Sequence, residues 1–397
     1  MTAESRPAVT ALTEQFGEGE ASIRSVSAPG RVNLIGGHTD YNEGFVLPTA
    51  IDRRTTVATR GRNDDRLRVY SVDFDETVTA DLDSIEPVDD PRWANYVLGV
   101  AAELRERGHD VGGADLVVDG GVPMGAGLSS SSALEVAVAD GLTTVSDIEM
   151  ERSELVTVCW TAENEFVGVG CGIMDQYTAV FSERGSALFL DCRTRDHEVI
   201  PFGADDVALI ATDTNVQHEL VDSAYNERVQ QCQTGVDHFQ QWIDGDVTSL
   251  RDVSPDAFEQ HASSLPETVR KRVRHVVSEN ERVQEAAAAL RRADFERVGE
   301  LLVESHESLR DDYEVSSVEL DAVVDVASRQ SGVLGSRMTG AGFGGCVVSL
   351  VRPSAIDEVA TAIRDGYRER TDIDPDIYVC RPDGGLTRHD GAPSRNE

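Results

Sequence analysis

Three glycine-rich segments, each joined to a run of apolar residues, set the strongest limit on what this chain can fold into. They lie at Pro29–Pro48, Val122–Ala137 and Gly335–Cys346. Glycine-rich loops cost conformational entropy, and a fold tolerates that cost where the backbone must bend sharply or pass close to another group. Turns account for some of these glycines but not for all, so we expect the loops to carry chemistry as well.

The first segment reads P-G-R-V-N-L-I-G-G-H-T-D-Y-N-E-G-F-V-L-P and crowds polar side chains around an apolar run. The polar residues are Arg31, Asn33, His38, Asp40, Tyr41 and Asn42. A site that recognises several hydroxyls needs this inventory of donors and acceptors, so the segment is typical of sugar binding. The alternative is a polar hairpin that turns at Gly36-Gly37, since glycine pairs mark turns routinely.

The second segment reads V-P-M-G-A-G-L-S-S-S-S-A-L-E-V-A and predicts a phosphate loop at the start of a helix. The residues expected to bind the nucleotide are Gly125, Ala126, Gly127, Leu128, Ser129, Ser130 and Ser131. Glycines let the backbone approach an anion, and serines cap the helix near its partly positive N–H groups. Because no lysine follows the glycines, the G-x-x-x-x-G-K-[ST] loop is excluded. A purely structural serine cap is the alternative.

The third segment, G-S-R-M-T-G-A-G-F-G-G-C, leads into the apolar run Val347–Val351. In this order and at these positions, the three segments resemble the motifs of the GHMP kinase superfamily, and Pro29–Pro48 resembles the galactokinase signature within it. Other stretches similar to galactokinases are Trp93–Val97, Ala162–Gln176, Ser223–Arg228 and Ser305–Asp312. The resemblance extends from about Ser27 to Leu350.

The resemblance implies an α+β, two-domain GHMP kinase fold with the active site in the cleft between the domains. It also implies ATP-dependent phosphorylation of the C1 hydroxyl of D-galactose, with Mg²⁺ neutralising the triphosphate. Asp175 matches the catalytic carboxylate, and Arg31 matches the arginine that keeps it ionised and stabilises the transferring phosphoryl group. Ser131 and Glu163 match the metal ligands. Read without the motif, Asp175 caps the following helix and Glu163 is a solvated helical charge.

Sugar-binding residues implied by the resemblance are Gly37, His38, Thr39, Asp40, Gly172 and Tyr225. The chain departs from galactokinases at Gly37, where those proteins typically carry a glutamate that contacts the C6 hydroxyl. Without that carboxylate, galactose is still a plausible substrate. The binding of galacturonate and of L-arabinose is then opposed less than in a protein that carries the glutamate, so these two sugars remain alternative substrates. A non-catalytic galactose sensor is a further alternative. Homoserine, mevalonate and shikimate-type kinases share the glycine-serine loop but lack the sugar segment.

Composition predicts an enzyme of a high-salt cell. The formal net charge of the 397-residue chain is −36, and Lys271 is its one lysine. Self-repulsion of this size opposes compactness in dilute buffer and is screened by concentrated salt, so we expect a halophilic archaeal origin. Nucleic acid and anionic membranes require a basic surface, so neither is expected as a partner. The partners should be a small-molecule sugar and ATP.

The six cysteines form no C-x-x-C pair, which argues against a metal knuckle or a disulfide framework. The chain begins without an apolar secretory stretch and has no segment of membrane-spanning length, so a cytoplasmic location is expected, and the resemblance favours a monomer.

Alternating strands and helices predict an N-terminal domain over residues 1–200, a C-terminal domain over 201–385 and a frayed tail over 386–397. Apolar periodicity also predicts one continuous helix over Ser278–Glu304.

Overall fold

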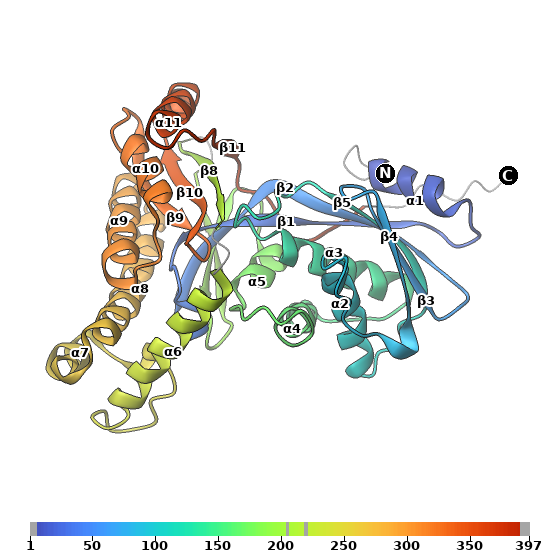
Figure 1. The fold of residues 1–397 in the computed structure, drawn as a ribbon, viewed down its shortest axis with the longest axis horizontal. Helices are drawn as coiled ribbons and strands as arrows, with labels where there is room; N and C mark the ends of the chain where they lie inside the picture. Colours follow the sequence, from blue (N-terminus) through green and yellow to red (C-terminus); the bar gives the residue numbers. More distant parts are fainter. Residues whose placement is uncertain (1–5, 204–205, 218–220, 390–397) are drawn as a thin grey trace.

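The computed structural model describes residues 6–203, 206–217 and 221–389. The N-terminal half is built on a long sheet, and the C-terminal half stands across one end of that sheet as a second sheet backed by helices (Figure 1). Among the described residues, no helix combines the length and apolar character needed to cross a membrane. The architecture is the α+β, two-domain arrangement predicted from the sequence.

The N-terminal sheet has eight strands. Its main path runs β12-β1-β2-β5-β3-β4, and β6 joins β2 and carries β7. The strands are β1 (Arg24–Ile35), β2 (Phe45–Gly61), β3 (Arg66–Ser71), β4 (Glu76–Asp81), β5 (Ala114–Gly120), β6 (Ser186–Asp191), β7 (His197–Pro201) and β12 (Thr387–His389). Strands β1 and β2 pair along most of their length, so they form the spine that reaches toward the C-terminal half.

Helices cover both faces of this sheet. Those on the cleft side are α2 (Ala94–Glu106), α3 (Ser130–Val145), α4 (Arg152–Thr161) and α5 (Met174–Phe181), while α1 (Arg6–Phe16) packs on β5 from the other face. Short turns of 3-10 helix lie at Asp40–Asn42 and Leu82–Ser84, and a π-turn at Ala162–Val167 continues α4. Valine, leucine and alanine from the sheet and from α2 to α5 form one buried cluster, so the hydrophobic effect holds these helices against the sheet.

The C-terminal half has a four-stranded sheet in the order β11-β8-β10-β9, all antiparallel. Its strands are β8 (Ala208–Gln217), β9 (Val333–Thr339), β10 (Gly344–Val351) and β11 (Asp376–Cys380). Its helices are α6 (Val221–Phe239), α7 (Pro255–His261), α8 (Glu267–Arg291), α9 (Phe295–Ser308), α10 (Val318–Ala327) and α11 (Ile356–Thr371), with short turns at Leu250–Asp252, Ala262–Ser264, Leu309–Tyr313 and Pro353–Ala355. In Figure 1 these helices form the tall layer at the left.

A third apolar cluster is shared by the two halves. It joins side chains of β1 and β2 to those of α8, α9, β8 and β10, and includes Leu34, Leu47, Val283 and Leu302, all fully buried. Each half also has a cluster of its own. The junction between the two halves is therefore close-packed core. This packing holds the glycine-rich segments that border it in fixed places.

Two predictions about the elements were wrong. The expected helix over Ser278–Glu304 is broken into α8 and α9, because Ala293 turns into the left-handed region with a φ of 54° and Asp294 caps α9 through the amide of Arg297. The tail expected from residue 386 is ordered at Thr387–His389, which pair with Ser25–Ser27 of β1. Residues 390–397 lie outside the described residues.

Candidate active site

A cavity of about 350 Å³ lies where the three glycine-rich segments meet. Predicted site residues that line it are Arg31, Gly37, His38, Asp40, Gly125, Gly127, Ser129, Ser130, Ser131, Glu163, Gly172, Asp175 and Tyr225. A second cavity of about 550 Å³ shares Gly125 and Gly127 with the first and extends along Gly342–Gly345. Segments from both halves of the sequence thus enclose one continuous cleft.

The centre of the cleft is a paired arginine and aspartate. Arg31 of β1 donates from Nε to Asp175 Oδ1 at 2.6 Å and from Nη2 to Oδ2 at 2.5 Å. Its third nitrogen, Nη1, donates to the carbonyl of Gly127 at 2.8 Å. The Arg31 side chain is 7% exposed, whereas that of Asp175 is 24% exposed and faces the cavity. Arg31 therefore fixes the carboxylate and the phosphate loop relative to each other.

The phosphate loop differs in one respect from the expected serine cap. Ser129 occupies the N-cap of α3 with a left-handed φ of 61°, and its side chain does not cap the helix. The Ser129 hydroxyl instead donates to Asp175 Oδ2 at 2.5 Å. A non-glycine residue in this region of φ is strained, and such strain occurs mainly at functional sites. Ser130 and Ser131 of the first turn of α3 line the cavity, and N–H groups at the start of a helix favour anions.

Two residues predicted to bind the nucleotide lie under the loop instead. Ala126 and Leu128 are fully buried in the cluster shared by the two halves. Only their backbone can reach a phosphate, and Leu128 O already accepts from the Arg31 amide at 3.0 Å. The apolar pair anchors the loop, which lets Gly125 and Gly127 adopt φ values of 76° and 71° above it.

The carboxylate of Asp40 packs against Gly172 and lies near enough to Asp175 to feel its charge. A Cβ placed on Gly172 would overlap the Asp40 carboxyl group, so glycine is required there by space alone. Burial, followed by the nearby charge of Asp175, raises the pKa of Asp40 to about 6. A carboxyl group with this pKa accepts hydrogen bonds from a sugar at neutral pH and donates one in mild acid.

His38 and Thr39 are committed to protein contacts. His38 lies 3.0 Å through Nδ1 from the hydroxyl of Tyr41 and 3.1 Å through Nε2 from the carbonyl of Ala341, and burial lowers its pKa to about 3. A neutral ring that donates to Ala341 and accepts from Tyr41 satisfies both contacts. Thr39 donates to the carbonyls of Gly36 and Phe45 and is fully buried. His38 therefore ties the sugar segment to the third glycine-rich loop.

Gly37 is enclosed by polar groups of the C-terminal half. Its amide donates to Glu279 at 3.2 Å, and its carbonyl lies 2.9 Å from His275 Nε2. A Cβ at this position would approach Arg337 Nη2 at 2.7 Å. Arg337 is fully buried and donates from Nη1 to the carbonyls of Asn33 and Leu34 at 2.9 Å. The guanidinium group of Arg337 therefore occupies the space that the Cβ of any larger residue at position 37 would need.

Glu163 and Ser131 lie together at the other end of the cavity. Glu163 accepts hydrogen bonds from Ser131, from Cys171 Sγ at 3.2 Å and from Gln176 Nε2 at 2.7 Å. Burial raises its pKa. In the part of the chain that the structure describes, no three acidic, histidine or cysteine side chains gather into a self-contained metal site. A buried carboxylate beside a hydroxyl, with neutral partners, suits a magnesium ion that arrives with nucleotide phosphates.

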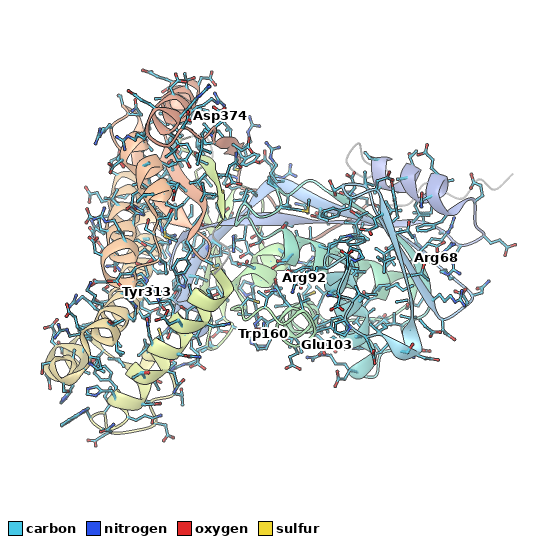
Figure 2. The ribbon with its side chains drawn as sticks, in the orientation of Figure 1. Arg68, Arg92, Glu103, Trp160, Tyr313 and Asp374 are labelled. Atoms are coloured by element: carbon cyan, nitrogen blue, oxygen red, sulfur yellow. The ribbon has the colours of Figure 1, made fainter. Side chains whose placement is uncertain are left out.

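Tyr225 lines the cavity close to His38 and Tyr41. Its ring lies 5.7 Å from that of His38 and 5.2 Å from that of Tyr41. Tyr313 of the C-terminal half adds a further ring beside His38. Figure 2 shows Tyr313 in the C-terminal half, and Arg92 and Trp160 in the N-terminal half. Tyr225 thus contributes to the lining of the cavity a side chain that combines an aromatic ring with a hydroxyl group.

Sequence reasoning missed some residues of the cleft. Tyr96, Gly340 and Ala341 line the first cavity, and Arg92 and Asn95 line the second. Gly340 and Ala341 belong to the third glycine-rich segment, whose composition was the available signal. Its turn packs against the phosphate loop, because a Cβ on Gly340 would lie 3.4 Å from the carbonyl of Gly127.

Comparisons with known proteins agree with this geometry. Residues 95–183 match the family model described as GHMP kinases N terminal domain, residues 286–369 match GHMP kinases C terminal, and residues 10–61 match the galactokinase galactose-binding signature. The chain is 47% identical over 363 residues to a galactokinase of Roseiflexus sp. (strain RS-1), covering 91% of this chain and 92% of the relative.

Solved structures show the same likeness. The crystal structure of Lactococcus lactis galactokinase complexed with galactose superposes with a TM-score of 0.92 at 37% identity, covering 97% of this chain and 100% of the other. Mevalonate kinase of Methanococcus jannaschii shares the fold alone, with a TM-score of 0.65 at 18% identity over 92% of this chain and 99% of the other.

Proposed function

Because this chain belongs to the galactokinase family of the GHMP kinases and phosphorylates galactose, we propose that Asp175 and Arg31 carry out the transfer from ATP to the C1 hydroxyl. The observation that carries this proposal is the bidentate pair between Arg31 and Asp175 at the centre of the cleft. Catalysis of phosphoryl transfer rests mainly on positioning and electrostatic stabilisation, and this pair supplies both.

Asp175 orients the C1 hydroxyl and takes up its proton. Both carboxylate oxygens are already fixed by Arg31 and Ser129, so the group does not have to be immobilised when the sugar binds. General-base residues of this kind need geometry first and a suitable charge state second. The guanidinium of Arg31 also stands between the carboxylate and the phosphate loop, where negative charge develops during transfer.

The sugar is held by the walls on which Asp40, Gly172 and Tyr225 lie. Asp40 and Tyr225 select the orientation of hydroxyl groups, and Gly172 leaves room for the Asp40 carboxylate. His38 and Thr39 support this wall through their side chains, and Gly37 supports it through a backbone contact to the C-terminal half. A buried set of polar groups discriminates well against sugars that leave one of them unpaired.

The nucleotide lies along the start of α3, with its phosphates over Gly125, Gly127 and the serines Ser129, Ser130 and Ser131. The loop contains no lysine, so backbone N–H groups and the partial positive charge of the helix carry this interaction. Ser131 and Glu163 would hold Mg²⁺, which neutralises phosphate charge when bound. Both residues fit that task, because their oxygens meet in the cavity through a hydrogen bond.

The proposal also covers the origin, the cellular location and the oligomeric state of the enzyme. The formal charge of −36 with one lysine favours a halophilic archaeal origin. We also propose that the enzyme is cytoplasmic and, from the family resemblance, that it acts as a monomer. We retain a division near residue 200 into two domains, with the shared apolar cluster between them.

The experiment is a phosphorylation assay with ATP and Mg²⁺ in molar KCl. It compares D-galactose, L-arabinose, D-galacturonate and D-glucose, using the native chain and the Asp175→Asn variant. Galactose should be the best substrate, and the variant should lose turnover on every sugar. A preference for L-arabinose or galacturonate would make Gly37 a specificity switch, and absence of turnover would support a sensor instead.

A further inference from the structure

A glutamine below the cleft joins two buried carboxyl groups. Gln176 Nε2 donates to Glu163 Oε2 at 2.7 Å and to Glu135 Oε2 at 3.2 Å. Gln176 and Glu135 are both fully buried, and neither lines the cavity. The three side chains come from α5, from the π-turn after α4 and from α3, so a single amide group connects the three helical elements that carry the proposed phosphate and metal site.

Glu135 is an unusual residue for this position. It lies one turn after Ser131 on α3 and sits among apolar core residues, where a leucine would cost less to bury. Its Oε1 atom and the Oε1 atom of Gln176 have no hydrogen-bond partner among the described residues. Burial, with the charge of Glu163 as the next cause, raises the pKa of Glu135 well above its usual value. Glu135 does not line the cavity. We therefore expect Glu135 to act on the site through its hydrogen bond with Gln176.

The geometry of the amide explains what Glu135 does. A side-chain amide can rotate so that either its NH₂ group or its oxygen faces a neighbour. Here both amide hydrogens have carboxyl acceptors, one on each side, and the oxygen is turned away from Glu163. Rotation would give up both of these hydrogen bonds. Glu135 thereby sets the orientation in which Gln176 donates to Glu163.

We propose that Glu135 and Gln176 are positioning residues that hold Glu163 beside Ser131. The first turn of α5 then has two tasks, since Asp175 faces the sugar while the next residue steadies the carboxylate that faces the metal. This inference rests on the proposed role of Glu163 toward Mg²⁺. Partners that orient a metal-binding carboxylate typically change metal affinity by about 10–100-fold when they are removed.

The test measures binding of Mn²⁺ as the probe ion, in the presence of ADP, by electron paramagnetic resonance on the full chain. The variants are Glu135→Met, Gln176→Met, Glu135→Gln and Glu163→Gln. Both Met variants keep the volume but lose the polar end, and should weaken Mn²⁺ binding about 10–100-fold. Glu135→Gln, which can still offer an oxygen to Gln176, should stay within about threefold of the native chain. The dissociation constant for galactose, measured by calorimetry, should not change in any of them.

The outcomes separate this inference from the proposed function. If Glu163→Gln weakens Mn²⁺ binding while both Met variants bind like the native chain, the positioning role is wrong and the role of Glu163 stands. If Glu163→Gln binds Mn²⁺ normally, the metal role of Glu163 is itself wrong. Equal losses of Mn²⁺ and galactose binding in the Met variants would show a merely structural pair. Should Glu135→Met not fold, normal Mn²⁺ binding by Gln176→Met alone overturns the inference.

Discussion

Asp175 is the residue whose charge the proposed mechanism needs most. Replacing it with asparagine keeps the shape but removes the negative charge that faces Arg31 and the proton acceptor for the sugar hydroxyl. Loss of a general base typically costs about 100- to 10,000-fold, so we expect kcat to fall by at least about 100-fold. An ADP-release assay measures kcat, and Asp196→Asn on the exposed surface is the control. A kcat within about threefold of the native value would contradict the assignment.

Asp40 should make stability depend on pH in a defined direction. Its pKa is about 6 in the folded protein and 3.8 as the ordinary value, so the folded state binds more protons between these pH values. Its contribution to stability is present below about pH 4 and is lost as the pH rises through about 6. Asp40→Asn removes this dependence.

The melting temperature of the Asp40→Asn variant, relative to the native chain, should therefore rise between pH 4 and pH 7. The corresponding change in the free energy of unfolding is on the order of 1–2 kcal/mol, because the carboxyl group is partly open to the cavity. Thermal unfolding followed by circular dichroism at several pH values gives the comparison. A constant difference between the two proteins across this range would show that the pKa of Asp40 is unshifted.

Gly172 should be intolerant of even one methyl group. Alanine at this position would place Cβ into the Asp40 carboxylate and push that group out of place. We expect KM for galactose to rise about tenfold or more, while KM for ATP changes little, because a misplaced polar contact costs more than 1 kcal/mol. Gly170→Ala is the matched control in the same loop, since its Cβ would meet only Asn226 at an ordinary 3.5 Å. Equal effects of the two variants would argue against the Asp40 explanation.

At the scale of elements, the π-turn Ala162–Val167 and the loop after it form one unit. Asn164 donates to the carbonyl of Trp160 at 2.9 Å and accepts from the amide of Cys171 at 3.1 Å. π-turns inside helices are often associated with functional sites, and this one carries Glu163 into the cleft. Asn164 is the link between that turn and the loop that contains Gly172.

Asn164→Leu should loosen residues 168–172 without unfolding the protein. The Cys171 amide should exchange its hydrogen at least about tenfold faster, which corresponds to losing a hydrogen bond of roughly 1–2 kcal/mol. Hydrogen exchange followed by mass spectrometry measures this, with exposed Glu165→Gln as the control. Unchanged exchange over residues 168–172 would mean that the Trp160 indole, which donates to the Cys171 carbonyl at 2.9 Å, holds the loop alone.

Local patterns predicted the elements well and their junctions less well. The glycine-serine run located the start of α3, and the apolar run Val347–Val351 lies in β10. The break at Ala293 was missed because alanine is the strongest helix former, and the stop depends on Asp294 capping the next helix. The contact of His38 with Ala341 joins residues 303 apart, so local periodicity holds no information about it.

Motif resemblance identified most of the residues in the cleft, but not their partners. The bond from Ser129 to Asp175 replaces an expected helix cap, and the buried residues Glu135 and Gln176 carried no signal beyond their neighbours in the motifs. Burial of Ala126 and Leu128 follows from packing against β1, which a linear pattern does not contain. Tertiary packing decides such details.

For the whole molecule, the acidic surface predicts that salt stabilises the fold. The formal charge is −36, and the Debye length falls from about 10 Å at 0.1 M to about 3 Å at 1 M salt. Screening should relieve the repulsion, so the melting temperature should rise with KCl over this range. Surface ion pairs such as Arg291 with Glu198 act in the opposite direction, because salt weakens them. Differential scanning fluorimetry at 0.1 M and 1 M KCl measures the two melting temperatures. A lower melting temperature at 1 M KCl would mean that the stabilisation by ion pairs outweighs the repulsion between acidic residues.

The pairing of β12 with β1 also bears on how the protein is made. Thr387–His389 cover the edge of β1 at Ser25–Ser27, yet the ribosome produces them long after it has produced β1. Until Thr387–His389 are made, the nascent chain therefore carries its sugar segment on a strand with one open edge, and such edges recruit other chains. Products that end early lack the closing strand and should be prone to aggregate. The sheet that carries the sugar segment is thus complete only after Thr387–His389 have been made.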